Sequence, residues 1–243
     1  GFWTVPANGS RAQPKLLFPV PGAQSLHGGV SADGTKLAYR AVLEASTGFW
    51  RVPLAGDSSG EVEPHEIQTG ASTANNLNIA ISPDGKSMAF VSNRAGGLEI
   101  WTAGVDGSFP RQLTNRPGEK SGTPRWSPDG QWIAFDGSIE GNSDIFLIRS
   151  TGGTPRRVTS HAAVECNVAW SADGQWLYFG SDRSGEFQVY KVPVQGWQEV
   201  QVTREGGYGG VESPLGDYFY YTTHYSAGRS EERRVGKECR SRW

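Results

Sequence analysis

The feature that most constrains this chain is a four-residue motif, Ser-x-Asp-Gly, that returns at a nearly constant spacing. It occurs at 31–34, 82–85, 127–130 and 171–174, with a decayed copy at 213–216. Successive motif glycines lie 51, 45, 44 and 42 residues apart. A proline after the serine presets the first central position of a type I turn, and the glycine accepts the left-handed backbone that follows. The motif therefore predicts a tight hairpin turn that is repeated along the chain.

Two further residue types recur at fixed distances from the motif. An aromatic residue stands sixteen residues after each of the first four glycines, and a threonine stands thirteen residues after the last three of these aromatics. The aromatics are Trp50, Trp101, Phe146 and Tyr190, and the threonines are Thr114, Thr159 and Thr203. Each repeat contains four short apolar runs separated by turn signals. Four antiparallel strands in a repeat of roughly forty residues predict one blade of a β-propeller.

The predicted fold is therefore all-β, a β-propeller of four-stranded antiparallel blades. Four whole blades are expected at about 25–68, 76–114, 121–159 and 164–203, and two half blades at 1–19 and from residue 207 onward. Both ends fall inside a blade, so we expect an incomplete part of a six- or seven-bladed ring, and a closed five-bladed ring remains an alternative. The expected domains are a propeller at 1–224 and a non-native or disordered tail at 225–243.

Composition favours one turn-rich domain, since the 243 residues include 33 glycines and 14 prolines. No run of about 18 apolar residues or signal-peptide pattern is present, so no direct membrane contact is expected.

Residues 229–243 contain six basic and three acidic residues, and without them the chain has 17 basic and 22 acidic residues, a net charge of −5. An acidic body argues against nucleic acid as a partner.

Most of the conspicuous residues have a structural interpretation. The aromatics of the second and third strands are expected to fill the space between blades; they are Trp50, Phe90, Trp101, Trp132, Phe135, Phe146, Trp176 and Tyr190. The motif aspartates should accept hydrogen bonds from turn amides. Cys166 is the one cysteine outside the tail, which allows no intrachain disulfide, and it is expected to be a small buried residue.

No catalytic residue, cofactor or metal is expected. Gly56-Asp57-Ser58-Ser59-Gly60 matches the Gly-x-Ser-x-Gly pattern of hydrolases, but it lies in a polar insertion with no helical pattern after it, whereas a nucleophile elbow leads into a helix. The four histidines show no metal-binding spacing. We therefore expect a chain without enzyme activity.

Binding is expected at one mouth of the central channel, where the first strand of each blade begins. The polar residues four positions before each motif serine are His27, Asn78, Thr123 and Asn167, with Asn76, Arg125 and Glu165 beside them. Because side chains alternate along a strand, equivalent positions should point to the same ring around the axis. Amide, hydroxyl and imidazole groups there suit a peptide backbone or a small polar ligand.

The repeats also resemble a known family. The stretches ISPDGKSMAFVSNR at 81–94, LEIW at 98–101 and PRQLT at 110–114 look like the WD-repeat-like blades of TolB-type propellers. In their order the repeats are similar to propellers attached to bacterial winged-helix regulators or serine/threonine kinases. Residues 229–243, beginning Arg-Ser-Glu-Glu, resemble the translation of a sequencing adapter.

This resemblance implies a non-catalytic module that binds a protein or peptide within a larger bacterial signalling or TolB-like protein. It also implies a periplasmic or extracytoplasmic location and a parent protein with a membrane anchor elsewhere, although a chain with one cysteine also fits the cytoplasm. The alternative is the gating propeller of a prolyl-oligopeptidase-type serine peptidase. A hydrolase domain encoded downstream would favour the peptidase, and a winged helix or kinase upstream would favour signalling.

Overall fold

The computed structural model describes residues 2–4, 15–18, 26–30, 36–43, 46–53, 65–70, 76–115, 119–139, 141–213 and 216–222. Side chains are described for 48–51, 65–70, 76–115, 119–138, 141–213 and 216–222. The predicted tail, the insertion around Ser58 and the side chain of His27 lie outside this part of the chain.

The regular elements in this part of the chain are all strands, and they form the four predicted blades. Blade two contains β3 (Leu26–Val30), β4 (Lys36–Leu43), β5 (Ser46–Pro53) and β6 (His65–Ile67). Blade three contains β7 (Asn76–Ile81), β8 (Ser87–Ser92), β9 (Glu99–Gly104) and β10 (Arg111–Gln112). Blade four contains β11 (Lys120–Trp126), β12 (Trp132–Ile139), β13 (Asn142–Arg149) and β14 (Arg156–Arg157). Blade five contains β15 (Glu165–Trp170), β16 (Trp176–Ser181), β17 (Gln188–Pro193) and β18 (Val200–Gln201).

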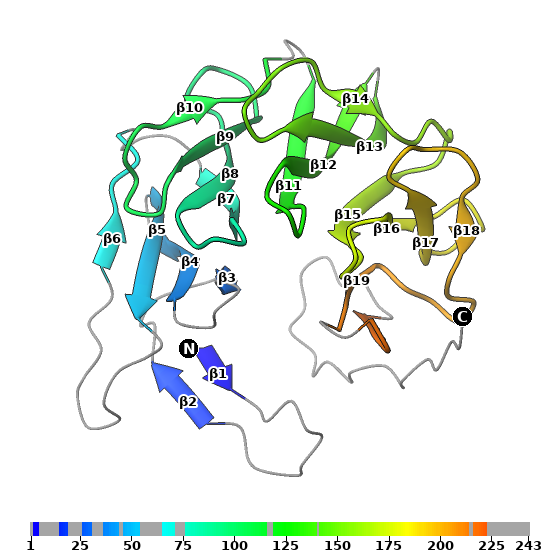
Figure 1. The fold of residues 1–243 in the computed structure, drawn as a ribbon, viewed down its shortest axis with the longest axis horizontal. Coiled ribbons are helices and arrows are strands. Elements are labelled where there is room, and N and C mark those ends of the chain that lie inside the picture. The colour runs from blue at the N-terminus through cyan, green and yellow to red at the C-terminus, as the bar shows by residue number, and fades with distance from the viewer. Residues whose placement is uncertain are drawn as a thin grey trace.

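Two half blades complete the description, β1 (Phe2–Thr4) with β2 (Lys15–Phe18), and β19 (Gly209–Glu212) with β20 (Phe219–Thr222). Every sheet is antiparallel, and each whole blade orders its strands as they occur in sequence. The sheets follow one another around an arc, with β7, β11 and β15 nearer its centre than β10, β14 and β18 (Figure 1). The predicted all-β, incomplete propeller is thus confirmed.

The Ser-x-Asp-Gly motif closes the turn between the first and second strands through the same hydrogen bonds in each described copy. In blade four, Ser127 Oγ donates to Asp129 Oδ1 (2.5 Å), which also accepts the Gln131 amide (3.0 Å). Ser127 Oγ in turn accepts the amide of Trp132 (2.9 Å). Blades three and five repeat this arrangement. The structural role predicted for the motif aspartate is confirmed.

The repeated threonine has an equally specific role, which its spacing alone did not explain. Its hydroxyl accepts a backbone N–H of the third strand: Ile100 donates to Thr114 (2.8 Å), Ile145 to Thr159 (2.9 Å) and Val189 to Thr203 (2.9 Å). All three threonines are at most 3% exposed. At the end of the short fourth strand, the buried threonine hydroxyl thus takes the place of a backbone carbonyl. It accepts a third-strand N–H that would otherwise be buried without a partner.

The hydrophobic core lies between the blades rather than within one sheet. One cluster joins blades three and four and includes Val91, Phe135 and Phe146, and another joins blades four and five and includes Leu147 and Phe179. The predicted aromatic core is confirmed for four residues that are at most 7% exposed, Phe90, Phe135, Phe146 and Tyr190. The four tryptophans of that list are only half-buried; they are Trp50, Trp101, Trp132 and Trp176.

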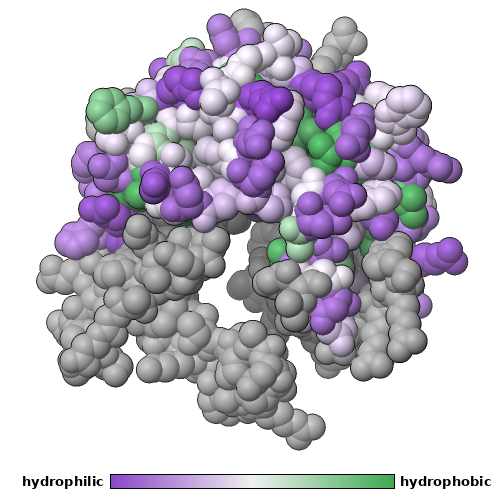
Figure 2. Space-filling model, viewed as in Figure 1, coloured by the Kyte–Doolittle hydropathy of each residue, from purple (hydrophilic) through white to green (hydrophobic). Residues whose placement is uncertain are grey.

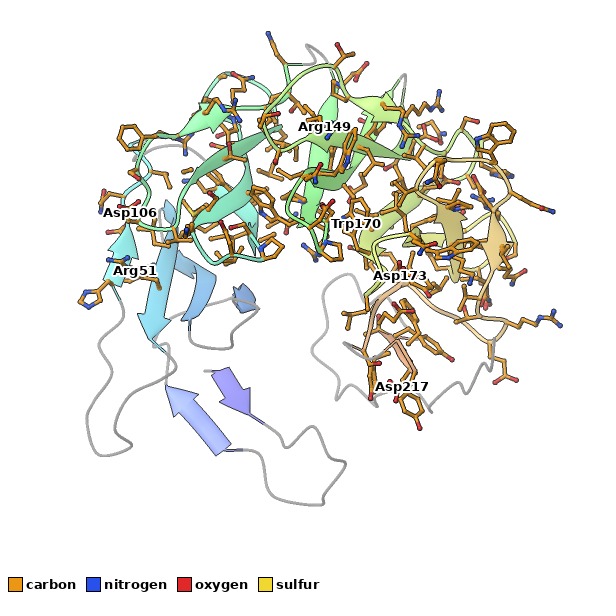
Figure 3. All side chains as sticks on the ribbon, viewed as in Figure 1. Arg51, Asp106, Arg149, Trp170, Asp173 and Asp217 are labelled. Carbon is orange, nitrogen blue, oxygen red and sulfur yellow. The ribbon has the colours of Figure 1, made fainter. Side chains whose placement is uncertain are left out.

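Hydrogen bonds connect neighbouring blades both near the propeller axis and at the outer strands. Near the axis, the indole N–H of Trp126 donates to the Ala80 carbonyl (3.2 Å) and that of Trp170 donates to the Arg125 carbonyl (3.0 Å). Trp170 lies between the inner strands of blades four and five (Figure 3). On the outer strands, Arg111 and Arg156 each donate to carbonyls in the turn of the next blade.

Within the described part of the chain, no helix long and apolar enough to span a membrane occurs. The face of the described blades seen in Figure 2 is mostly hydrophilic, with scattered hydrophobic residues. Phe109 and Trp197 are the most exposed hydrophobic side chains among the described residues, at 92% and 88%.

Candidate functional site

The inner strands carry a distortion at the positions predicted to line the channel mouth. Asn78, Thr123 and Asn167 have positive φ angles of 48°, 38° and 55°, a region that residues with a Cβ rarely adopt. At each of these points the register of the inner strand against the second strand shifts by a β-bulge. Strict alternation along the inner strand, which the prediction assumed, is therefore wrong at this point. The bulge changes the direction in which these side chains point. The sequence pattern did not indicate the bulge.

The half blade of β19 and β20 shows how tightly the inner strands approach one another. Gly209 holds the position that Asn167 holds in blade five, four residues before the motif serine. A Cβ at Gly209 would lie 2.9 Å from the Cβ of Asn167. Glycine therefore leaves room beside β19 for the side chain of Asn167.

Three of the predicted residues meet at the joint between blades four and five. Thr123 and Arg125 on β11 and the backbone of Asn167 on β15 surround the carboxylate of Asp136, which projects from β12. Asp136 Oδ1 is buried and has no hydrogen-bond partner among the described residues. Gly122 lies opposite Asp136 in the sheet, and a Cβ there would approach Asp136 Oδ2 to 2.6 Å.

Burial raises the pKa of Asp136, and this effect exceeds the opposing hydrogen bonds from Thr123 and from the Asn167 backbone and the charge of Arg125. Burial likewise lowers the pKa of Arg125, against the charge of Asp136. A carboxyl group with a raised pKa and an unused oxygen can accept a donor from a ligand or donate its own proton. This is the most chemically versatile group near the predicted mouth.

The sequence analysis did not single out Asp136, although the repeat contained a signal for it. Asp136 stands nine residues after the motif serine, where the other copies have Arg40, Val91 and Gly180. A carboxylate in an apolar second strand is unexpected in a core position, and none of the other three copies has one there. Comparing the repeats position by position would have identified it.

Asn76 and Glu165, also predicted, are the first residues of β7 and β15 and are 4% and 0% exposed. Each is bound by an arginine from its own blade: Arg94 donates to Asn76 (3.1 Å), and Arg183 pairs with Glu165. Burial raises the pKa of Glu165 to about 7, although Thr159 and Arg183 act against it. These two side chains belong to the blade framework, and a ligand contact by either stays a prediction.

His27 is in β3, where its backbone pairs with Arg40. Its side chain is outside the described residues, so its place in the predicted ring stays a prediction.

Cavities lie between blades three and four on both faces of the arc. A cavity of about 270 Å³ is lined by Asn78, Ser121, Gly122 and Asp136, among others, and an adjoining one of about 570 Å³ extends outward. A third, of about 690 Å³, lies among the motif turns and includes Asp84, Asp129 and Trp126. The smallest of the three touches the predicted mouth.

Nothing in the described residues resembles a metal centre, since no group of three or more His, Cys, Asp or Glu side chains converges there. Cys166 is half-buried, and burial, the largest effect, raises the pKa of its thiol to about 12. A thiol in that state is a poor nucleophile at neutral pH.

Residues 99–236 match the family described as the Tricorn protease N-terminal β-propeller domain, and the chain belongs to this family. No curated protein matches the chain.

Solved structures show the same architecture. The chain is 28% identical to a candidate TolB from Agrobacterium tumefaciens, with a TM-score of 0.73, over 90% of this chain and 76% of that one. It is 22% identical to TolB from Acinetobacter baumannii, with a TM-score of 0.70, over 88% of this chain and 52% of that one. A puromycin-hydrolysing peptidase from Mycobacterium tuberculosis is 16% identical with a TM-score of 0.59, over 76% of this chain and 30% of that one. The chain is thus a propeller of the TolB type that spans only part of these proteins.

Proposed function

We propose that this chain is a non-catalytic binding module that holds a protein or peptide partner at the mouth of the propeller, within a larger bacterial signalling or TolB-like protein. The observation that carries the proposal is the group of Thr123, Arg125 and Asn167 around Asp136, whose Oδ1 is buried without a partner. A buried acceptor left unpaired is costly, and a ligand that supplies a donor removes that cost.

The chemistry of the mouth suits a peptide. Asn78 and Asn167 offer amides that both donate and accept, Thr123 offers a hydroxyl, and Arg125 and Asp136 balance in charge. A peptide backbone presents donors and acceptors in alternation without net charge, so it matches this set better than a phosphate does. The likeness to TolB structures supports a protein partner and a periplasmic or extracytoplasmic location as parts of the same proposal.

The test uses a peptide selected from a random display library against the purified chain. Calorimetric titration should show that the double change Asn78→Ala with Asn167→Ala weakens the selected peptide at least about tenfold, since each lost hydrogen bond costs about 0.5–1.5 kcal/mol. Asp182→Ala, on the neighbouring turn of blade five, is the control and should not change the affinity. Unchanged binding in the double variant would move the site elsewhere.

A second candidate is the gating propeller of a serine peptidase of the prolyl-oligopeptidase type. The observation in its favour is the matched family, which is described from the N-terminal propeller of a protease. In that role the mouth would admit a peptide on its way to a separate hydrolase domain. In either role we expect the chain alone to be inactive, so an ester substrate should be hydrolysed equally slowly by the unaltered chain and by Ser58→Ala.

A further inference from the structure

The cavity of about 690 Å³ at the joint between blades three and four lies on the side of the motif turns. The motif follows directly on each inner strand, so this cavity is at the end of β7 and β11 that is away from their first residues, where the mouth was predicted. It shares no lining residue with the other two cavities. It is therefore separate from the group around Asp136.

The two blades beside this cavity are as close to each other as blades four and five are. A Cβ at Gly130 would lie 3.7 Å from Pro83, and one at Gly174 would lie 3.5 Å from Pro128, so successive motif turns are in contact at both joints. The outer-strand arginines described above also span both joints in the same way. The cavity therefore does not come from a wider gap between the blades, and its cause lies in the side chains.

The corresponding space in blade four is filled by an aromatic ring and a cation. Trp132 and Arg149 are paired across β12 and β13, and the guanidinium lies 4.2 Å from the centre of the Trp132 ring (Figure 3). The ring packs against the core between blades four and five. In blade five, Lys191 Nζ lies 4.3 Å from the ring centre of Trp176. Trp132 and Trp176 both stand five residues after the motif serine.

Blade three has neither the ring nor the cation. Five residues after its motif serine stands Ser87, and Gly104, which pairs with Ser87 across β8 and β9, takes the place of Arg149. The counterpart of Lys191 is Thr102. Ser87, Gly104 and Thr102 all line the cavity. The cavity is thus the space that a tryptophan and a cation occupy in the next two blades.

Apolar and cationic groups in the wall suit an aromatic guest. Pro83 and Trp126 supply apolar surface, and Phe109 adds a further ring. Phe109 is 92% exposed and has a φ of 49°, so an apolar side chain is held in water on a backbone that residues with a Cβ rarely adopt. Arg111 is bound to two backbone carbonyls of blade four, and its charge is available to a neighbouring ring.

Two carboxylates in the wall can accept the N–H of an indole. Asp84 and Asp129 each use Oδ1 to bind the motif serine and a turn amide. The hydrogen bond from the serine, followed by that from the amide, lowers the pKa of both carboxyl groups, so both are charged at neutral pH. Oδ2 of each takes no part in the turn, so a donor on a guest can bind there without disturbing the motif.

We propose that this cavity binds a tryptophan side chain of a protein partner, which takes the place of the ring that Trp132 and Trp176 provide in the next blades. The indole packs on Trp126 and Phe109, and its N–H donates to one of the two motif carboxylates. This site goes beyond the proposed function, because it lies apart from the mouth and takes a different chemical group.

The probes are three capped tripeptides, acetyl-Gly-Trp-Gly-amide and its leucine and lysine counterparts. Leucine tests whether any apolar side chain is sufficient, and lysine tests whether the carboxylates alone attract a cation. Titration of the full chain, followed by amide NMR shifts, should show that the tryptophan peptide binds at least about tenfold more tightly than either of the others. The largest shifts should be at Ser87, Gly104 and Gly130, which line the cavity.

The exposed ring of the wall provides a matched pair of variants. Phe109→Ala removes apolar surface from the cavity and should weaken the tryptophan peptide by about threefold or more. Trp197→Ala removes a similarly exposed ring from the corresponding loop of blade five, which does not line the cavity, and it should leave the affinity unchanged.

Ser87→Trp supplies the ring within the chain and should abolish binding of the tryptophan peptide. Ser184→Trp, which adds the same ring on an exposed turn of blade five, should leave that binding unchanged. Gly104 is not altered, because a Cβ there would lie 2.5 Å from Ser108 Oγ. If Ser87→Trp does not fold, the three peptides, the shift map and Phe109→Ala on the folded chain still decide the question.

Equal binding of the tryptophan and leucine peptides, binding of the lysine peptide as tight as that of the tryptophan peptide, or no binding of any of them would each overturn the inference. The largest shifts at Asn78 or Asn167 would also overturn it, since the tryptophan would then lie at the mouth. The proposed function fails separately, because its library-selected peptide is tested by those two asparagines, and neither lines this cavity.

Discussion

The joint between blades three and four and the joint between blades four and five have the same backbone and different contents. Both are built on a motif turn, an inner-strand bulge and a buried threonine that accepts a third-strand amide. At the joint of blades four and five, Arg183 neutralises the fully buried Glu165. At the joint of blades three and four, Ser121 stands unpaired beside a cavity.

The repeat determines where a side chain lies. The residue at that position determines whether the polar groups between two blades are paired. An arginine and its acceptor convert one joint into a buried ionic contact, which costs desolvation and is stable only while both partners are present. Their absence leaves the other joint with an unpaired hydroxyl beside a cavity. The four predictions below test this contrast, from the largest expected effect to the smallest.

The largest effect is expected from Arg183→Met. It removes the charged hydrogen bonds to both Glu165 and Glu199, so the free energy of unfolding should fall by about 3 kcal/mol at neutral pH, as measured by urea denaturation. Arg149→Met is the matched control, because Arg149 also stacks on an aromatic ring, that of Trp132, but is exposed, and it should cost less than about 1 kcal/mol. Equal losses in the two variants would remove the distinction between a buried bridge and a surface contact.

The second prediction concerns pH. The pKa of Glu165 is about 7 in the folded chain against an ordinary value of 4.5, so the folded state binds more protons between these values. Stability should therefore be greatest below pH 4.5 as far as this group is concerned, and it should decline as the pH rises to 7, by up to roughly 3 kcal/mol.

Glu165→Gln should remove this decline in the free energy of unfolding with pH. The measurement is denaturation at a series of pH values between 4.5 and 7. Asp173→Asn is the control, since hydrogen bonding to Ser171 lowers the pKa of Asp173 and places its titration below this range. A slope between pH 4.5 and 7 that is the same with and without Glu165 would contradict the prediction.

The third prediction tests what the two joints share. Thr114→Val and Thr159→Val each remove the hydroxyl that accepts a buried backbone N–H, and each should lower the free energy of unfolding by about 1–3 kcal/mol. The two losses should agree within about 0.5 kcal/mol, the usual spread of a surface substitution. A loss confined to Thr159→Val would mean that the threonine matters only where Glu165 is present.

The smallest effect should have the opposite sign. Ser121→Ala removes a buried hydroxyl that has no partner, so it should raise the free energy of unfolding by about 0.5–1 kcal/mol in the absence of ligand. Ser127→Ala, which loses a satisfied motif hydroxyl, should lower it by about 0.5–1.5 kcal/mol. Both are measured by thermal or urea unfolding, and a destabilised Ser121→Ala would show that this hydroxyl has a partner.

Much of the fold could be predicted because it is a property of short segments. A turn such as 127–130 is closed by its own side chains, and the offset of sixteen residues follows from strands of fixed length and tight turns. The candidate site could be predicted only in part. Thr123 and Asn167 were found because they share an offset, and Arg125 because it lies beside Thr123. Asn76 and Glu165 share an offset too, but they are held by arginines instead.

The sequence by itself determined the blades, their order and their antiparallel pairing, since hydrophobic runs and turn residues act over distances of a few residues. Only the tertiary structure decided which polar groups are satisfied. The bulges at Asn78, Thr123 and Asn167 arise in the pairing of the first strand with the second strand of each blade, the raised pKa of Asp136 depends on burial that no local pattern specifies, and the unpaired hydroxyl of Ser121 becomes visible only beside the joints that have an arginine. Burial and pairing are properties of contacts between blades, and those contacts form only when the chain has brought distant residues together.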